Sequence, residues 1–317
     1  MRAPDGVAVS AAARRAIGRA VWEFRTARRA VERRPGRGAL HALRTACRRL
    51  DAAIAVYRPA VVLPAAADGA AIAGLARGTG LIRDLDVARR LIERSSAPRP
   101  EWKPLRRWIR RARRERLRAL GKRLTRRSRR KLVTALRRWV DEPEFSRHAG
   151  LPLARIGHVL LRARAERVAR HPAWRLDGAE PPDAAARREI HAFRNEARLL
   201  RYQLEALEPE QPGRHDDRIE DLRALQDTLG GFHDVDLVEA LADRAGIPLG
   251  PATALDLDRR RRDRWSDWLL LRRRLFPAGT RPSWWTGLPN EAPGGAARSA
   301  RHGTRRERRD RGVRPPA

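Results

Sequence analysis

The sequence of 317 residues predicts an all-α protein built from two similar halves, and three observations lead to this prediction. Apolar residues recur with helical spacing over most of the chain, and the breaks fall at Pro and Gly. Strand signals are nearly absent, because runs of Val, Ile and Thr are few and no Asn-Gly pair occurs. One motif also occurs twice, at positions that differ by 150: His41, Arg44, Arg48 and Leu50, and then His191, Arg194, Arg198 and Leu200.

The helical pattern can be followed along the whole body of the chain. The predicted helices cover residues 8–33, 38–57, 65–78, 82–95, 103–140 (as one helix or as two that meet near Ser128), 151–170, 183–207, 217–229, 233–245 and 252–275. Pro143 and the segment 150–152 separate a first repeat of about 8–148 from a second repeat of about 150–276. Residues 278–317 are rich in Pro, Gly, Ser and Arg, which predicts a disordered basic tail. Trp284 and Trp285 are exceptions in this tail and could dock on the body or on a partner.

The two halves stay in register beyond the first motif. Leu75, Gly80, Asp84 and Asp86 are followed 150 positions later by Leu225, Gly230, Asp234 and Asp236. We expect each Gly to end a helix and the aspartates to begin the next one, where carboxylates cap free amides and match the helix dipole. A second interpretation pairs these carboxylates with the arginines of the motif. General acid–base catalysis by paired acids is the least favoured interpretation, because many arginines surround them and no substrate pocket is evident.

The charge of the chain predicts an anionic partner. The formal net charge is +33 and the pI is about 11.8, so self-repulsion destabilises the compact state unless an anion offsets it. Only Lys103, Lys122 and Lys131 are lysines among the 71 basic residues. Arginine binds phosphate oxygens two at a time, which favours a phosphate ligand, although biased codon usage also explains part of this preference. The segment 102–140 is especially basic and predicts a strongly cationic helix face.

Each copy of the motif predicts an amphipathic helix. Positions i, i+3 and i+7 share one helix face, so His41, Arg44 and Arg48 form a basic stripe. The second copy forms the same stripe from His191, Arg194, Arg198 and Arg201. The opposite faces are apolar: Leu43, Cys47, Leu50, Ile54 and Tyr57 in the first copy, and Phe193, Ala197, Leu200, Leu204 and Leu207 in the second. A basic stripe is usually a solvated face, but its recurrence at matching positions favours a shared binding function.

Several classes of protein are disfavoured by the sequence. Cys47 is the single cysteine, so the chain can form neither an internal disulfide nor a cysteine metal cluster. The first residues lack the pattern of a signal peptide. The most apolar stretch, residues 60–75, is short and interrupted by Pro64 and Asp68, whereas a membrane span needs roughly 20 apolar residues. We therefore expect a cytoplasmic protein without a membrane segment.

Four segments together resemble the CHAD family, the conserved histidine α-helical domain. They are the His/Arg segments 41–50 and 191–202, the Arg-Asp-Leu-Asp-Val segment 83–87, and the Leu-Gln-Asp-Thr-Leu-Gly segment 225–230. The resemblance covers roughly residues 8–276. It implies two four-helix bundles related by pseudo-symmetry, with a basic groove between them that binds inorganic polyphosphate. It also implies these ligand-facing residues: His41, Arg44, Arg48, Arg49, His191, Arg194, Arg198 and Arg201.

The resemblance implies neither a cofactor nor catalysis. Some family members are fused to a triphosphate tunnel enzyme domain, whose Glu-x-Glu-x-Lys signature is missing here, so we expect a non-catalytic protein. Some members associate with polyphosphate granules, which suggests a granule location and a separately encoded polyphosphate-metabolising enzyme as a partner. Where relatives often repeat Arg, this chain has Asp51 and Leu199, so each stripe has one cation fewer at its C-terminal end.

Two other functions compete with polyphosphate binding. The charge supports nonspecific nucleic-acid binding equally well, but the body shows neither an aromatic platform for single strands nor the spacing of a helix-turn-helix or zinc finger. An enzyme or metal protein could use His41 and His191 as phosphoacceptors or metal ligands. The surrounding arginines repel a metal cation, so we expect no metal site.

Overall fold

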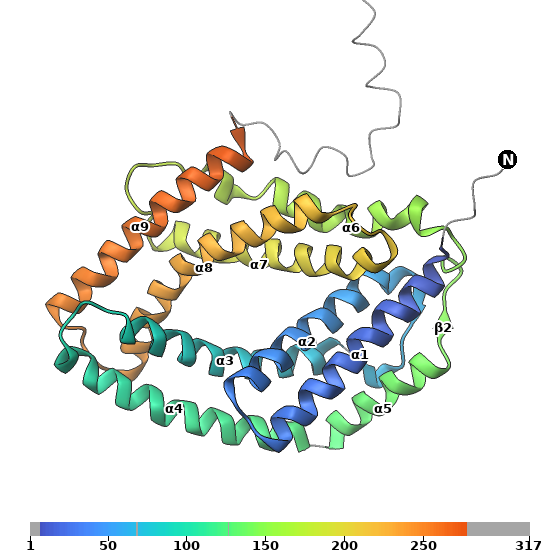
Figure 1. Cartoon of the computed structure of the whole chain (residues 1–317), viewed down its shortest axis with the longest axis horizontal. Coiled ribbons are helices and arrows are strands. Elements are labelled where there is room, and N and C mark those ends of the chain that lie inside the picture. The colour runs from blue at the N-terminus through green and yellow to red at the C-terminus, as the bar shows by residue number, and fades with distance from the viewer. Residues whose placement is uncertain (1–6, 68, 126, 278–317) are drawn as a thin grey trace, which may run out of the picture.

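The computed structural model describes residues 7–277 except residues 68 and 126, and within them helices dominate (Figure 1). The α-helices are α1 (Val9–Arg33), α2 (Arg37–Tyr57), α3 (Gly69–Glu93), α4 (Arg99–Thr125), α5 (Arg127–Asp141), α6 (Leu153–Ala169), α7 (Ala184–Leu207), α8 (Asp216–Ala245) and α9 (Pro251–Leu275). The 3-10 helices are η1 (Arg58–Ala60), η2 (Ala65–Ala67), η3 (Pro172–Arg175) and η4 (Glu208–Glu210). The all-α prediction is confirmed. The predicted tail 278–317, with Trp284 and Trp285, lies outside the described residues.

Two predicted helix breaks are wrong. We expected Gly80 and Gly230 to end helices, but α3 and α8 run through both positions without interruption. A glycine inside a helix costs only about 0.5–1 kcal/mol and keeps its backbone N–H, so the packing of the flanking apolar residues outweighs it. The true end of α8 is Gly246, whose φ of 64° is left-handed and whose N–H donates to the last turn.

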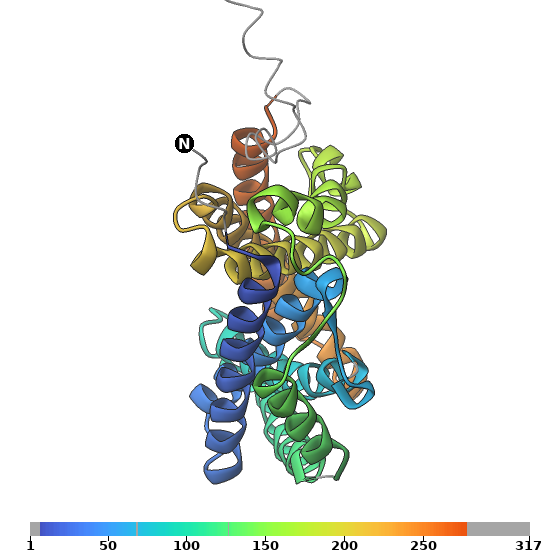
Figure 2. The same cartoon turned by 90° about the vertical axis from the view of Figure 1, so that its right-hand side faces the viewer.

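The helices follow the offset of the sequence motif. Those of the first half, α2, α3 and α4, begin and end close to 150 positions before α7, α8 and α9. The basic segment 103–140 forms two helices, since α4 ends at Thr125 and α5 begins at Arg127. Both views place α6 and α7 at one end of the molecule and α4 and α5 at the other, with α1 and α2 between them (Figure 1 and Figure 2).

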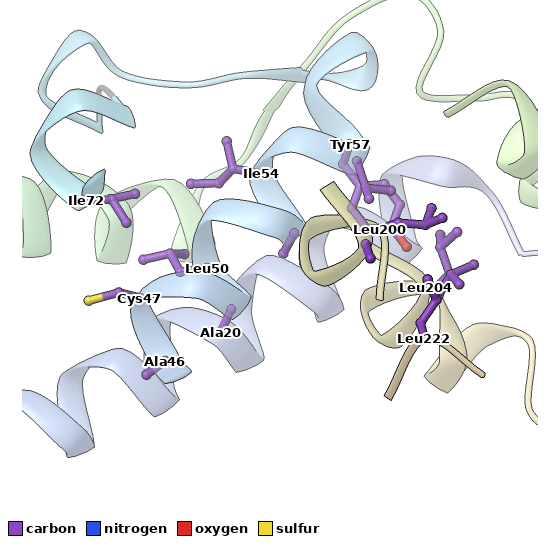
Figure 3. Close-up of a cluster of buried hydrophobic side chains, with 14 of the residues drawn as sticks. Ala20, Ala46, Cys47, Leu50, Ile54, Tyr57, Ile72, Leu200, Leu204 and Leu222 are labelled. Atoms are coloured by element: carbon purple, nitrogen blue, oxygen red, sulfur yellow. The ribbon is translucent and has the colours of Figure 1, made fainter. Parts of the chain in front are cut away.

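The apolar core is shared between the two halves. The larger cluster joins α1, α2, α5, α6 and α7 with parts of α3, α4, α8 and α9, and Figure 3 shows Tyr57 of α2 beside Leu200 of α7. A second cluster joins α3 and α4 to α8 and α9 through residues such as Leu105 and Val238. Because both clusters contain residues from both halves, burial of apolar area binds the halves to each other.

Buried tryptophans of the outer helices donate hydrogen bonds to backbone carbonyls in the segments between helices. The indole N–H of Trp139 donates to the carbonyl of Val62 at 2.9 Å, and that of Trp268 donates to Leu176 at 3.1 Å. Each indole thus buries a large apolar surface and still satisfies its polar atom. A short antiparallel pair, β1 (Val61–Val62) and β2 (Glu144–Phe145), closes the first half. No helix in the described part of the chain is long and apolar enough to cross a membrane.

Candidate anion-binding site

The two basic stripes lie opposite apolar faces, as predicted. On α2, His41 is exposed, Arg44 and Arg48 are half-buried, and the apolar residues on the other side are fully buried. On α7, His191 is exposed, and Arg194 and Arg198 are half-buried in the same way. Each stripe starts at an exposed turn and runs toward the middle of its helix, where α2 and α7 pack together. The stripes therefore converge at the contact between the two halves.

Five guanidinium groups from both halves form one group, here called the arginine cluster: Arg44, Arg48, Arg83, Arg194 and Arg198. Burial, with repulsion from Arg48 and Arg194, lowers the pKa of Arg44 to about 10. Burial, with repulsion from Arg48, Arg194 and Arg44, lowers the pKa of Arg198 to about 9. Arg44 and Arg198 therefore remain protonated at neutral pH, and the folded protein holds like charges together at an electrostatic cost.

The arginine cluster carries unsatisfied donors. Arg44, Arg48, Arg83 and Arg194 make no ion pair with any described carboxylate. Three of their buried nitrogens have no hydrogen-bond partner at all: Nε of Arg44, Nη1 of Arg83 and Nε of Arg194. A buried charged donor without a partner is energetically costly. An anion with several oxygen acceptors has the chemistry to satisfy such donors.

Gly230 allows one of these arginines to approach α8. A β-carbon built at Gly230 would lie 3.4 Å from Nη2 of Arg194, whereas one built at Gly80 would meet nothing within 4 Å. Neither glycine has a left-handed backbone. The glycine at position 230 thus leaves space for the guanidinium group on a helix surface. This role replaces the predicted role as a helix end.

The four aspartates do not cap helices, and that prediction is wrong. Asp84 and Asp86 lie inside α3, and Asp234 and Asp236 lie inside α8. Burial raises the pKa of Asp84, while the charges of Arg44 and Arg83 oppose the rise. Burial also raises the pKa of Asp234, opposed by Arg194 and Arg83. These two carboxylates therefore lie beside the arginine cluster without forming a salt bridge to it, so their pairing with the motif arginines stays a prediction.

The other two aspartates bind arginines that lie outside the cluster. Oδ1 of Asp86 accepts a hydrogen bond from Nε of Arg113 on α4 at 2.8 Å, and Nε of Arg37 on α2 lies 3.8 Å away. In the second half, Oδ1 of Asp236 lies 3.5 Å from both Arg187 on α7 and Arg261 on α9. Positions 37 and 86 differ from 187 and 236 by the same 150. Each aspartate thus joins three helices of its own half.

The histidines differ between the halves. Nδ1 of His191 lies 3.2 Å from Nδ1 of His233, and their rings are 4.5 Å apart between centroids. Burial, the neighbouring His191 and the charges of Arg194 and Arg198 lower the pKa of His233 to about 3. Burial and nearby arginines also lower the pKa values of His41 and His191. All three imidazoles are therefore neutral at pH 7 in the free protein.

Two of the expected ligand residues point to carboxylates instead of joining the arginine cluster. Nη1 of Arg49 donates to Glu23 of α1 at 3.1 Å. Arg201 donates to Glu205 at 2.6 Å and to Gln226 at 3.1 Å. Their positive charges are compensated within the protein. The structure thus brings together the inner residues of the stripes and separates these two from them.

Arg83 and His233 belong to the site but were not among the residues we expected there. Arg83 contributes an unsatisfied buried nitrogen, and His233 forms the pair with His191. The signal was present in the sequence, because positions 83 and 233 also differ by 150 and each precedes a repeated aspartate. Among the residues that the structure describes, no group of three or more His, Cys, Asp or Glu side chains could hold a metal ion.

Solved structures and a protein family are similar to this chain. The chain is similar to PptA from Streptomyces chartreusis, with 19% identity and a TM-score of 0.59 over 84% of this chain and 97% of that one. It is also similar to the CHAD domain from the plant Ricinus communis, with 20% identity and a TM-score of 0.58 over 88% and 91% of the two chains. These likenesses show the fold. No curated protein sequence matches the chain. The CHAD domain family model matches residues 15–243, well over half of the sequence, so the chain belongs to the CHAD domain family.

Proposed function

We propose that this protein binds inorganic polyphosphate, without catalysing a reaction, through His and Arg side chains from both halves. The CHAD family is linked to polyphosphate binding in general and is not generally described as catalytic. The observation that carries the proposal is the arginine cluster, in which buried guanidinium nitrogens of Arg44, Arg83 and Arg194 have no partner. Phosphate oxygens would satisfy these donors and offset the mutual repulsion of the cluster.

A linear polyanion suits the site better than a single phosphate. The stripes on α2 and α7 place successive arginines about one helical turn apart, roughly 5.4 Å. A chain of phosphates could therefore contact both stripes at once and release many counterions, which gives strong binding at low salt. The binding residues in this proposal are His41, Arg44, Arg48, Arg83, His191, Arg194, Arg198 and His233. Asp84 and Asp234 offset part of the positive charge of the cluster, while Arg49 and Arg201 stay with their own carboxylates.

The test measures affinity for long-chain polyphosphate and for duplex DNA of matched charge, in one buffer over a salt series. The central variant replaces Arg44, Arg48, Arg194 and Arg198 with Ala. Its matched control replaces four exposed arginines away from the cluster, Arg58, Arg147, Arg155 and Arg170, with Ala. Both variants lose the same formal charge. We expect only the central variant to lose polyphosphate affinity by more than tenfold, with its helical circular dichroism unchanged. Equal losses in both variants, or duplex DNA binding as tightly as polyphosphate, would refute the specific site.

Granule targeting is a finer part of the same proposal. A protein that binds polyphosphate without consuming it would accumulate where the polymer is stored in the cytoplasm. There it would meet a separately encoded polyphosphate-metabolising enzyme. Fluorescence imaging of the tagged protein tests this, because granule foci should form with the control variant and should be lost with the central variant.

A further inference from the structure

A second concave basic surface lies on α4, which runs along one edge of the molecule (Figure 1). It is a hollow of about 730 Å³ between α4 and the segment that follows α8. Its apolar wall consists of Pro104, Trp108, Ala245 and Ile247. Its rim consists of Arg107, Arg110, Arg111, Arg113 and Arg114, and no carboxylate lines it. We call this surface the α4 hollow.

Trp108 is the aromatic residue of the α4 hollow. It packs against the second apolar cluster and stays partly exposed. By comparison, Trp102, which lies nearer the start of α4, is fully buried. A second hollow of about 470 Å³ adjoins the first and shares Trp108 and Arg111 with it. Trp108 thus lines both hollows.

The rim of the α4 hollow offers positive charge that the protein itself does not compensate. Arg113 is bound to Asp86, but Arg107, Arg111 and Arg114 are exposed and make no ion pair with a described residue. These three share one helix face, at spacings of four and three residues, and Arg118 extends the row by another turn. The adjoining hollow contains Asp84 and Glu115, together with Arg111, Arg116 and Arg244.

The apolar wall makes the α4 hollow chemically different from the arginine cluster. A polyphosphate chain has no apolar or aromatic group, so a tryptophan face and an isoleucine side chain would contribute nothing to its binding. A nucleotide carries both a planar base and a phosphate, and bases stack on tryptophan with little dependence on sequence. The row of arginines continues beyond the hollow, which suits a polymer better than a mononucleotide.

We infer that the α4 hollow binds single-stranded nucleic acid, with a base against Trp108 and backbone phosphates on Arg107, Arg111 and Arg114. This site goes beyond the proposed polyphosphate site and does not depend on it. It assigns a function to the cationic helix that the polyphosphate proposal leaves unused. It also supplies the aromatic contact that the sequence pattern alone did not reveal.

The test uses a fluorescein-labelled deoxyadenosine strand of about twelve nucleotides and an abasic strand of the same length. The two probes carry the same phosphates, and only the first carries bases. One variant, Trp108→Leu, keeps an apolar side chain and removes the stacking face. The other replaces Arg107, Arg111 and Arg114 with Ala, with R58A/R147A/R155A as its charge-matched control. Fluorescence anisotropy gives the affinities over a salt series, and circular dichroism confirms that each variant is folded.

We expect the wild-type protein to bind the deoxyadenosine strand about tenfold more tightly than the abasic strand. Trp108→Leu should abolish this difference and leave abasic binding unchanged. The triple α4 variant should lower the affinity for both strands at least tenfold. It should also lower the slope of log affinity against log salt concentration by about two, since each lost phosphate contact contributes about 0.7. In its control, the affinity for both probes should change less than threefold. If Trp108→Leu does not fold, the triple variant against its control still decides whether the strand binds here.

Three results would overturn the inference. The first is a triple variant that binds the deoxyadenosine strand with wild-type affinity, and the second is a Trp108→Leu variant that loses affinity equally for both probes. The third is a central variant whose affinity for the strand falls as much as its affinity for polyphosphate. The polyphosphate proposal fails separately. It fails if the central variant keeps its polyphosphate affinity, whatever happens at α4.

Discussion

Nδ1 of His191 and Nδ1 of His233 lie 3.2 Å apart, which is a hydrogen-bond distance between two ring nitrogens from different helices. Such a contact needs one N–H donor and one unprotonated acceptor, so both nitrogens cannot carry a proton together. His191 lies on α7 and His233 on α8, beside Arg194 and Arg198. The pair is therefore held neutral by its surroundings and is sensitive to any anion that enters them.

Protonation of this pair should destabilise the free protein. The pKa of His233 is lowered to about 3 from an ordinary value of 6.5, so between these pH values the unfolded chain binds more protons than the folded chain. The free energy of unfolding therefore rises with pH across this window and is lost as the pH falls below about 6.5. We expect His233→Asn to reduce this loss by about 1 to 2 kcal/mol between pH 7 and pH 4, measured by urea denaturation. His148→Asn, at an exposed position outside the pair, serves as the control for removing an imidazole elsewhere.

Polyphosphate binding should become tighter as the pH falls. Bound phosphates favour the charged form of a neighbouring imidazole and raise its pKa from the lowered values of the free protein. Binding then takes up protons, so affinity increases as the pH decreases from 8 to 6. Isothermal titration calorimetry in buffers of different ionisation enthalpy measures this uptake. If the affinity does not depend on pH and no protons are taken up, the histidines do not contact the bound phosphates.

Replacing Arg198 with Met should stabilise the free protein and weaken binding. Burial and repulsion from Arg48, Arg194 and Arg44 lower the pKa of Arg198 to about 9, which means that its charge opposes folding. Met keeps most of the side-chain volume and removes the charge. We expect a gain of about 1 to 2 kcal/mol in the free energy of unfolding, after allowance for solvent screening, and at least a threefold loss of polyphosphate affinity. A destabilised variant would show that Arg198 is compensated within the fold.

Gly80 and Gly230 form a matched pair for substitution. A methyl group at position 80 meets nothing within 4 Å, so Gly80→Ala should stabilise α3 by about 0.5 to 1 kcal/mol and leave binding unchanged. At position 230 it would touch Nη2 of Arg194 at 3.4 Å, the short limit of ordinary contact, so Gly230→Ala should shift this flexible side chain slightly and lower polyphosphate affinity modestly. Thermal unfolding and binding titrations measure both effects. Equal behaviour of the two variants in binding would show that the contact with Arg194 is unimportant.

Asp86→Asn should lower the free energy of unfolding more than the same substitution at an exposed aspartate does. Asp86 is only 8% exposed and accepts from Arg113 at 2.8 Å, so the amide removes a charge-assisted bond between α3 and α4. We expect a loss of about 1.5 to 3 kcal/mol in the free energy of unfolding. Asp141→Asn is the control, since Asp141 lies 4.0 Å from Arg137 and both side chains are mostly exposed. Chemical denaturation compares the two variants, and losses of equal size would contradict the buried-pair argument.

The inner parts of the stripes could be predicted because helical spacing fixes which side chains share a face. Leu43 and Phe193 are buried where periodicity places them, and Arg44 and Arg194 lie on the other side. Arg49 could not be placed by the same reasoning. Its partner Glu23 lies 26 positions earlier on another helix, and only packing of α1 against α2 brings them together. Gly230 was misread because a glycine signals flexibility locally, whereas the helix is maintained by distant apolar contacts.

The helical class, the offset of 150 and the high positive charge, which favours an anionic partner, follow from the order and composition of the residues alone. These properties depend on local periodicity and composition, which need no knowledge of distant neighbours. Helix packing, by contrast, brings the charge of Arg44 close enough to lower the pKa of Arg198 in the other half, places His191 against His233, and joins Asp86 to Arg113. These relationships arise from the shared apolar core, which fixes the angle and depth at which α2, α7 and α8 pack. Electrostatic energies change steeply with such distances, so the site exists only once that core has formed.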